Sequence, residues 1–317
     1  MNKELIVGNL SAKAGEKTQG YLKVEGTTEE MPVTIINGKR EGKTLLVTAG
    51  IHGCEYTAIK AVMELSRELD PEEVHGQVIL VHPVNLKGFK KKTAALMPED
   101  GKNILRVFPG NNEGSVSEKI AYTITTELIS KADFYLDVHG GDLHEDLLPH
   151  IYYPGSSEKH ITEASIKIAE VFDVPYYVKS MTTNGTYTTA ALGGVPSLLV
   201  ERGGAGIIKA EDVILYKRDI LNVMAKLNMI EYTSGKRKFK PVEIKNARYE
   251  DSRYEGCWIC YVKPGDYISK GQKLGDITDF FGNVIYSCTA EFDGVILYNT
   301  VAFSVAEGDS LVAYGEV

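Results

Sequence analysis

The sequence predicts an α/β protein in which a sheet lies between helices, followed by a smaller domain rich in β-strands. In residues 1–231, short apolar runs alternate with longer amphipathic stretches, as in layers of strands and helices. After residue 232, short runs are separated by frequent turn signals, which favours a small β-barrel or sandwich. We therefore expect two domains, residues 1–231 and residues 232–317.

The elements of the first domain follow from the spacing of its apolar residues. Short apolar runs predict strands over residues 44–49, 77–82, 133–138, 151–153 and 197–200. Apolar residues at helical spacing predict helices over residues 55–69, 115–129, 158–171, 188–192 and 211–227. Ser115 and Glu118 fit a capping box at the start of the second helix, and Pro71 ends the first.

The second domain is expected to follow a polar, basic linker at residues 234–238. Turn signals recur at residues 263–266, 269–271, 281–283, 292–294 and 307–309. This tail resembles biotinyl/lipoyl-type barrel-sandwich domains, but its turn at residues 290–294 lacks the lysine that carriers of that fold display. We therefore expect a structural or oligomer-forming domain that shapes the mouth of the site, not an acyl carrier.

Composition narrows the class of protein. The 43 Asp and Glu residues outnumber the 35 Lys and Arg residues, and the net charge of -8 argues against a nucleic-acid partner. No stretch approaches the roughly 20 apolar residues of a membrane helix, and the N-terminus lacks the apolar core of a signal peptide. Four cysteines in 317 residues do not make a disulfide framework. We expect a cytoplasmic protein without a membrane partner.

Two candidate metal ligands lie where the strand at residues 44–49 gives way to a helix. His52 and Glu55 are three residues apart across this turn, and an imidazole and a carboxylate are both good zinc ligands. Gly50 and Gly53 allow the tight turn and leave space above it. A loop histidine beside a helix-capping glutamate is the alternative.

A third candidate ligand, His139, ends another predicted strand. It would complete a His-Glu-His set with an open fourth position, which is the catalytic kind of zinc site. Asp137 lies on the same strand face and could orient a ligand histidine. The alternative is a histidine at a strand end that has ordinary hydrogen-bond partners and binds no metal.

A carboxylate also closes the apolar strand at residues 197–200. Glu201 lies where a general base could take a proton from the attacking water. The alternative is a carboxylate at the sheet edge that pairs with Arg202.

Four motifs together resemble the succinylglutamate desuccinylase/aspartoacylase family, a branch of the zinc carboxypeptidase-like hydrolases. Residues 50–55 (GIHGCE) are similar to its G-x-H-G-x-E, and residues 100–110 (DGKNILRVFPG) to its D-G-x-N-L-N-R-x-F-P-G. Residues 137–140 (DVHG) match its D-x-H-G, and residues 197–201 match the strand that ends in its catalytic glutamate. The motifs keep the family's order, and the β-rich tail is typical of bacterial members.

The resemblance implies a mixed sheet of the zinc carboxypeptidase-like type. It implies one zinc ion per chain, held by His52, Glu55 and His139, with Glu201 as general base. It also implies a small N-acyl amino acid or related amide as substrate, bound in part by Asn103 and Arg106.

The chain departs from the family pattern near this substrate segment. Leu105 replaces the Asn that precedes the family's Arg, although Arg106 can still pair with a carboxylate through two hydrogen bonds. No arginine occurs between Glu68 and Leu105 to stabilise an oxyanion. A lysine among Lys87 and Lys90–Lys92 could act there as a point charge without the planar fork of arginine, but a solvated face is the favoured interpretation of this run. Tyr187, just before the alanine-rich helix expected at residues 188–192, could hydrogen-bond substrate or simply pack on its neighbours.

The sequence therefore favours a zinc-dependent deacylase of small N-acyl amino acids or amines. A metallocarboxypeptidase that acts on short peptides would use the same residues. A third hypothesis is not a hydrolase: a metal-binding or small-molecule-sensing protein with weak activity. The missing arginine and Leu105 motivate this hypothesis. The sequence does not fix the oligomeric state, and a homo-oligomer is one possibility.

Overall fold

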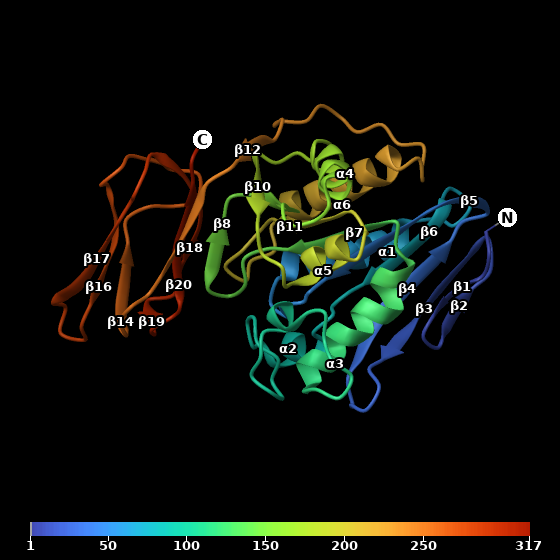
Figure 1. The fold of residues 1–317 in the computed structure, drawn as a ribbon, viewed down its shortest axis with the longest axis horizontal. Coiled ribbons are helices and arrows are strands. Elements are labelled where there is room, and N and C mark those ends of the chain that lie inside the picture. Colours follow the sequence, from blue (N-terminus) through green and yellow to red (C-terminus); the bar gives the residue numbers. More distant parts are fainter. Residues whose placement is uncertain (1) are drawn as a thin grey trace.

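The computed structural model describes residues 2–317. Figure 1 shows a large sheet with helices on both faces and a separate β-region that holds the C-terminus. This mixed α/β fold with C-terminal antiparallel sheets confirms the predicted fold class.

The large sheet has nine strands and is mixed. From one edge to the other they are β12 (Val242–Ile244), β10 (Tyr176–Ser180), β9 (His150–Pro154), β11 (Ser197–Glu201), β7 (Phe134–His139), β5 (Arg40–Ala49), β6 (His75–Val81), β4 (Glu30–Asn37) and β3 (Glu16–Lys23). The strands β5, β7 and β11 are parallel neighbours, whereas β9 is antiparallel to β11 and β4 to β6. The carboxyl ends of β5, β7 and β11 therefore meet at one edge of the sheet, where ligands bind in folds of this kind.

Each face of the sheet has its own apolar core. Helices α1 (Tyr56–Glu68), α4 (Lys159–Ala169) and α6 (Ala210–Lys226) pack on one face. Helices α3 (Val116–Thr123) and α5 (Thr186–Leu192) and the hairpin β1 (Leu5–Val7) and β2 (Leu10–Ala12) pack on the other. Strand β5 serves both cores, with Leu45 and Val47 on one side and Leu46 on the other, as strand alternation requires.

The helix expected at residues 115–129 begins as predicted but does not stay regular. The capping box of Ser115 and Glu118 is present. After α3 the chain becomes a π-helix, Ile124–Leu128, and then a 3-10 turn, Ile129–Lys131. The hydroxyl of Thr125 donates to the backbone oxygen of Ala121 at 2.9 Å, a bond that competes with regular helix geometry.

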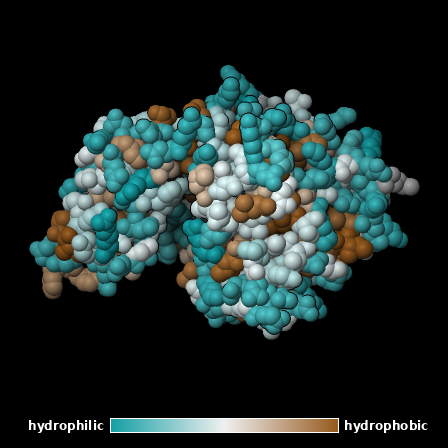
Figure 2. Space-filling view, viewed as in Figure 1, coloured by the Kyte–Doolittle hydropathy of each residue, from teal (hydrophilic) through white to brown (hydrophobic). Residues whose placement is uncertain are grey.

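Two shorter helices lie between β6 and α3. They are α2 (Leu86–Lys91) and the 3-10 helix η1 (Ile104–Val107), which carries Arg106. Among residues 2–317, no helix is both long and apolar enough to cross a bilayer. On the face of the molecule shown in Figure 2, hydrophilic residues cover most of the surface and hydrophobic ones are scattered between them.

The C-terminal region consists of two antiparallel sheets. One contains β13 (Ala247–Asp251), β20 (Ser310–Gly315), β18 (Gly294–Thr300), β15 (Tyr267–Ile268) and β8 (Glu145–Leu147). The other contains β17 (Val284–Thr289), β16 (Lys273–Thr278), β14 (Gly256–Cys260) and β19 (Ser304–Val305). Buried Trp258, Leu274 and Ile296 are part of the core of this region.

The two regions exchange strands across the expected boundary between residues 231 and 232. Strand β12 lies after that boundary but pairs with β10 in the large sheet. Strand β8 lies before it but pairs with β18 in the C-terminal sheet. The division at residue 231 stays a prediction, and the exchange brings the C-terminal sheets close to the carboxyl ends of the central strands.

Candidate metal centre and active site

Glu55 reaches the carboxyl edge of the sheet because the chain turns sharply after β5. Gly50 adopts a φ of 72°, and a Cβ on Gly53 would lie 2.3 Å from the backbone nitrogen of Phe89. Glycine is therefore needed at both positions. The turn delivers Glu55 as the residue that precedes α1, with only 3% of it exposed.

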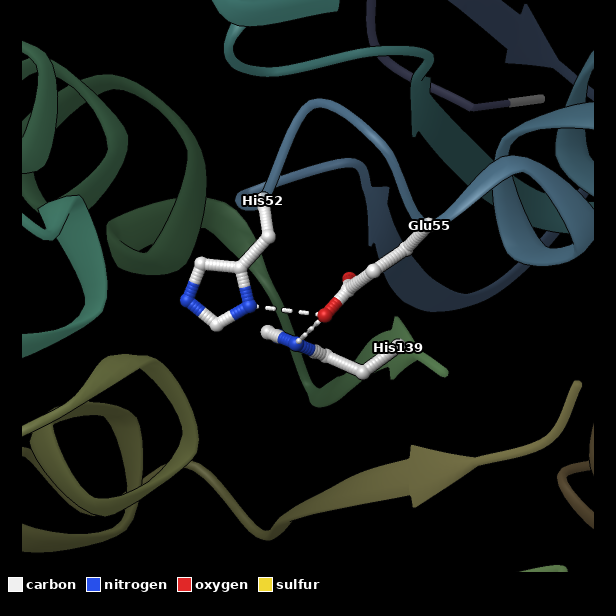
Figure 3. A group of neighbouring side chains, drawn as sticks. All are labelled: His52, Glu55 and His139. Carbon is white, nitrogen blue, oxygen red and sulfur yellow. Dashed lines mark hydrogen bonds and ion pairs between the residues drawn. The ribbon is translucent and has the colours of Figure 1, made fainter. Parts of the chain in front are cut away.

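The structure brings His52, Glu55 and His139 together, as Figure 3 shows. Oε1 of Glu55 lies 2.7 Å from Nδ1 of His52 and 3.1 Å from Nδ1 of His139. The two rings meet edge to face, with centroids 5.1 Å apart. One potential ligand atom from each residue lies within 4.8 Å of the other two.

The outer nitrogens of both rings face oxygen acceptors. Nε2 of His52 lies 3.1 Å from Oδ1 of Asn103, an oxygen that also accepts from the backbone nitrogen of Leu105 at 2.9 Å. Nε2 of His139 lies 2.8 Å from Oδ2 of Asp137. Each Nε2 can donate to the oxygen that it faces, which leaves the Nδ1 lone pair of each neutral ring available on the side of Glu55.

This arrangement fits a bound cation. Two imidazole lone pairs and a carboxylate oxygen converge on one point, and Oε2 of Glu55 is buried without a hydrogen-bond partner among residues 2–317. Although burial opposes it, Asp137 and Glu55 raise the pKa of His139 well above its usual value. The site thus attracts a proton, which a metal ion would displace. Two nitrogens and one carboxylate with an open position suit catalytic zinc.

Glu201 stands beside this group. It ends β11 directly opposite His139 on β7, so the two side chains leave the sheet on the same face. Its Oε2 is buried and has no hydrogen-bond partner among residues 2–317. Burial raises the pKa of Glu201 well above its usual value, although His139 opposes the shift. A carboxylate with a raised pKa and a free oxygen can accept and return a proton.

Arg202 does not pair with Glu201, which corrects the alternative that the sequence left open. It is the first residue after β11 and forms a buried ion pair with Asp219 of α6, with 2.7 Å between Nη2 and Oδ2. Glu201 is therefore left to the site.

A cavity of about 640 Å³ opens over these residues. It includes seven of the eight residues singled out in the sequence, namely His52, Glu55, Asn103, Arg106, His139, Tyr187 and Glu201. Asp137 lies beneath, where its Oδ1 also accepts from the Thr48 hydroxyl at 2.6 Å. A cavity of this size suits a small molecule.

The structure separates the roles of the remaining predicted residues. The side-chain oxygen of Asn103 is engaged with His52, so this residue orients a ring at least as much as it could contact substrate. Arg106 and Tyr187 line the cavity. Of the expected lysines, Lys87 pairs with Glu29 and Glu99 instead of facing the site.

Several cavity residues were missed from the sequence. Tyr152 and Lys179 come from the first 231 residues, and Lys245, Tyr249, Tyr298 and Ser310 come from the C-terminal region. The hydroxyls of Tyr249 and Tyr152 lie 3.2 Å apart, so the two regions touch at the cavity wall. No local motif marks these residues, because only strand pairing brings them together.

The comparisons with known proteins agree with this geometry. The succinylglutamate desuccinylase/aspartoacylase catalytic domain matches residues 41–227. The chain belongs to this family. The match spans the turn at His52, the strand end at His139 and the strand end at Glu201, and it confirms the resemblance seen in the four motifs.

The similar proteins cover almost the whole chain. The chain is 30% identical to an N-alpha-acetyl-L-2,4-diaminobutyric acid deacetylase of Halomonas elongata, over 98% of this chain and 95% of that protein. A succinylglutamate desuccinylase/aspartoacylase structure from Rhodobacter sphaeroides aligns with a TM-score of 0.84 and 27% identity, covering 96% of each chain. The product-bound ectoine utilization protein EutE (DoeB) of Ruegeria pomeroyi shares the fold, with a TM-score of 0.87, 24% identity and coverage of 96% and 97%.

Proposed function

We propose that this protein is a zinc-dependent deacylase that hydrolyses the amide bond of a small N-acyl amino acid. The observation that carries the proposal is the convergence of two imidazole lone pairs and the Glu55 carboxylate beside the unpaired carboxylate of Glu201. A metal-binding or small-molecule-sensing protein needs the first three groups but has no use for an unpaired glutamate oxygen next to them.

Each residue has a distinct role in the proposed reaction. His52 and His139 would hold Zn²⁺ through Nδ1 and Glu55 through its carboxylate, while Asn103 and Asp137 fix the ring orientations. When bound, Zn²⁺ supplies a Lewis acid that lowers the pKa of water and polarises a carbonyl. Glu201 takes the proton from the attacking water and passes it to the leaving nitrogen, so that the amide and water become a carboxylic acid and an amine.

The substrate class rests on the family and on the cavity. The Halomonas relative is named for removing an acetyl group from an N-acetylated diamino acid. A cavity of about 640 Å³, walled partly by the C-terminal sheets, suits such a small molecule better than an extended peptide. Arg106 in that cavity is the group proposed to pair with the substrate carboxylate.

An activity screen tests the proposal. Protein loaded with one zinc per chain is incubated with N-acetyl, N-succinyl and N-formyl amino acids and, in parallel, with short peptides, and the released amine is quantified. We expect turnover of at least one N-acyl amino acid. Turnover of peptides alone would favour the carboxypeptidase, and tight metal binding without turnover of either class would favour the sensor. Light scattering on the same sample measures whether the chain forms a homo-oligomer.

A further inference from the structure

One side chain of α6 joins the ends of β7 and β11. The hydroxyl of buried Tyr216 lies 2.5 Å from the backbone oxygen of His139 and 2.8 Å from that of Val200. A tyrosine has a single hydroxyl proton, so the two carbonyls share one donor. His139 is a proposed metal ligand and Val200 precedes Glu201, so this contact bridges the two strands at the residues that carry the chemistry.

The same helix holds β11 a second time. Asp219, one turn beyond Tyr216, pairs with Arg202, whose guanidinium carbon lies 5.6 Å from the centre of the Tyr216 ring. Because side chains alternate along a strand, Arg202 faces α6 while Glu201 faces the cavity. Helix α6 therefore holds both neighbours of Glu201, Val200 and Arg202, from the side of the sheet opposite the cavity.

The two segments that follow β7 and β11 stay in close contact with each other. The backbone nitrogen of Gly141 donates to the oxygen of Gly203 at 2.8 Å. A Cβ on Gly140 would lie 2.4 Å from the backbone oxygen of Arg202, so no side chain can stand between the strands there. Loss of the shared hydroxyl would remove the hydrogen bonds that tie these two carbonyls to α6, and we expect the strand ends to shift as a result.

We propose that Tyr216 is a positioning residue that sets the separation between His139 and Glu201 and so aligns the general base with the metal site. This inference rests on the function proposed above. A displacement of about 1 Å at a reacting group can lower a rate by about 10²-fold. We therefore expect the Tyr216 hydroxyl to affect kcat although it does not contact the substrate.

The variant Tyr216→Phe tests the proposal because it keeps the buried ring and removes only the hydroxyl. We expect kcat to fall about 10- to 100-fold with KM nearly unchanged. The affinity for Zn²⁺ alone, measured by competition with a chelator, should fall by about tenfold. The matched control is Tyr153→Phe, which keeps a buried ring and loses a hydroxyl that donates to Glu243 at 2.5 Å. It should keep wild-type values of both quantities.

Wild-type kcat and zinc affinity in folded Tyr216→Phe would overturn the proposal, and so would equal losses in Tyr153→Phe. If Tyr216→Phe does not fold, Asp219→Asn replaces it, since it keeps the side-chain shape but weakens the hold on Arg202. The same fall in kcat is then expected, and an unchanged kcat would overturn the proposal. Zinc affinity needs no substrate, so it still decides the question if wild-type protein hydrolyses no N-acyl amino acid.

Discussion

Nε2 of His139 lies 2.8 Å from Oδ2 of Asp137, two residues back along the same strand. Asp137 is fully buried and also accepts from the hydroxyls of Thr48 and Thr186, so its orientation is fixed on several sides. The pair holds the imidazole with Nδ1 toward Glu55. Strand β7 thus supplies both a proposed ligand and the group that aims it.

The first prediction concerns metal content. Replacement of His52 or His139 by Ala removes one of the three converging ligand atoms, so zinc per chain should fall sharply in either variant. Both variants should still fold, because the sheet carries its own cores on both faces. Elemental analysis and circular dichroism measure the two properties. His160→Ala, at an exposed position on α4, is the control that should keep its zinc. Full zinc occupancy in both ligand variants would refute the assignment.

The second prediction concerns recognition of an anionic group by Arg106. Losing a hydrogen bond to a charged group costs about 1.5–3 kcal/mol. Arg106→Ala should therefore lower kcat/KM for substrates that carry a carboxylate by roughly 10- to 100-fold. The comparison is each substrate's amide analogue, which lacks the charge and should lose less. Arg67→Ala, exposed on α1, should change neither. Equal losses with acidic and neutral substrates would argue against carboxylate recognition.

The third prediction concerns stability in acid. A hydrogen bond from the backbone of Ser115, together with Lys102, lowers the pKa of Glu118 to about 2. The unfolded chain takes up a proton at this residue near pH 4.5, whereas the folded chain keeps the carboxylate ionised. The stabilisation is therefore complete above that pH and is lost as the pH falls toward 2.

Glu118→Gln keeps the capping partner but removes this ionisation. Wild type should be more stable than Glu118→Gln at pH 7, and the difference should shrink at pH 3.5 in urea denaturation. Glu163→Gln, whose exposed partner Lys159 lies 3.7 Å away, should show no such change with pH. A difference that stays constant between the two pH values would contradict the prediction.

The proposed ligands could be predicted from the sequence because strand ends of a parallel sheet meet at one edge. His52 and His139 each follow an apolar run, and that pattern alone placed them near each other. The direct pairing of His139 with Glu201 could not be predicted, because it depends on the register between β7 and β11.

The cavity wall could not be predicted for a related reason. Tyr298 reaches the cavity on β18, which pairs with β8, and Lys245 follows β12, which joins the large sheet. Such contacts between distant segments leave no periodic signal in either one. The early strands β3 and β4 were also not predicted. In β3 most side chains are polar and at least partly exposed, so no apolar run marks it.

The last prediction concerns the proton that Glu201 is proposed to carry. Glu201→Gln keeps the shape of the side chain but cannot accept a proton, and loss of general-base help typically costs about 10²–10⁴ in rate. Because Glu201 is not one of the three converging ligands, zinc per chain should stay at the wild-type value. Both quantities are measured on one preparation, with Glu211→Gln, exposed on α6, as the control. Loss of zinc would make Glu201 a ligand and place the role of Glu55 in question. Normal turnover would mean that the base lies elsewhere, and Glu145, the other glutamate in the cavity besides Glu55, would be the next residue to replace.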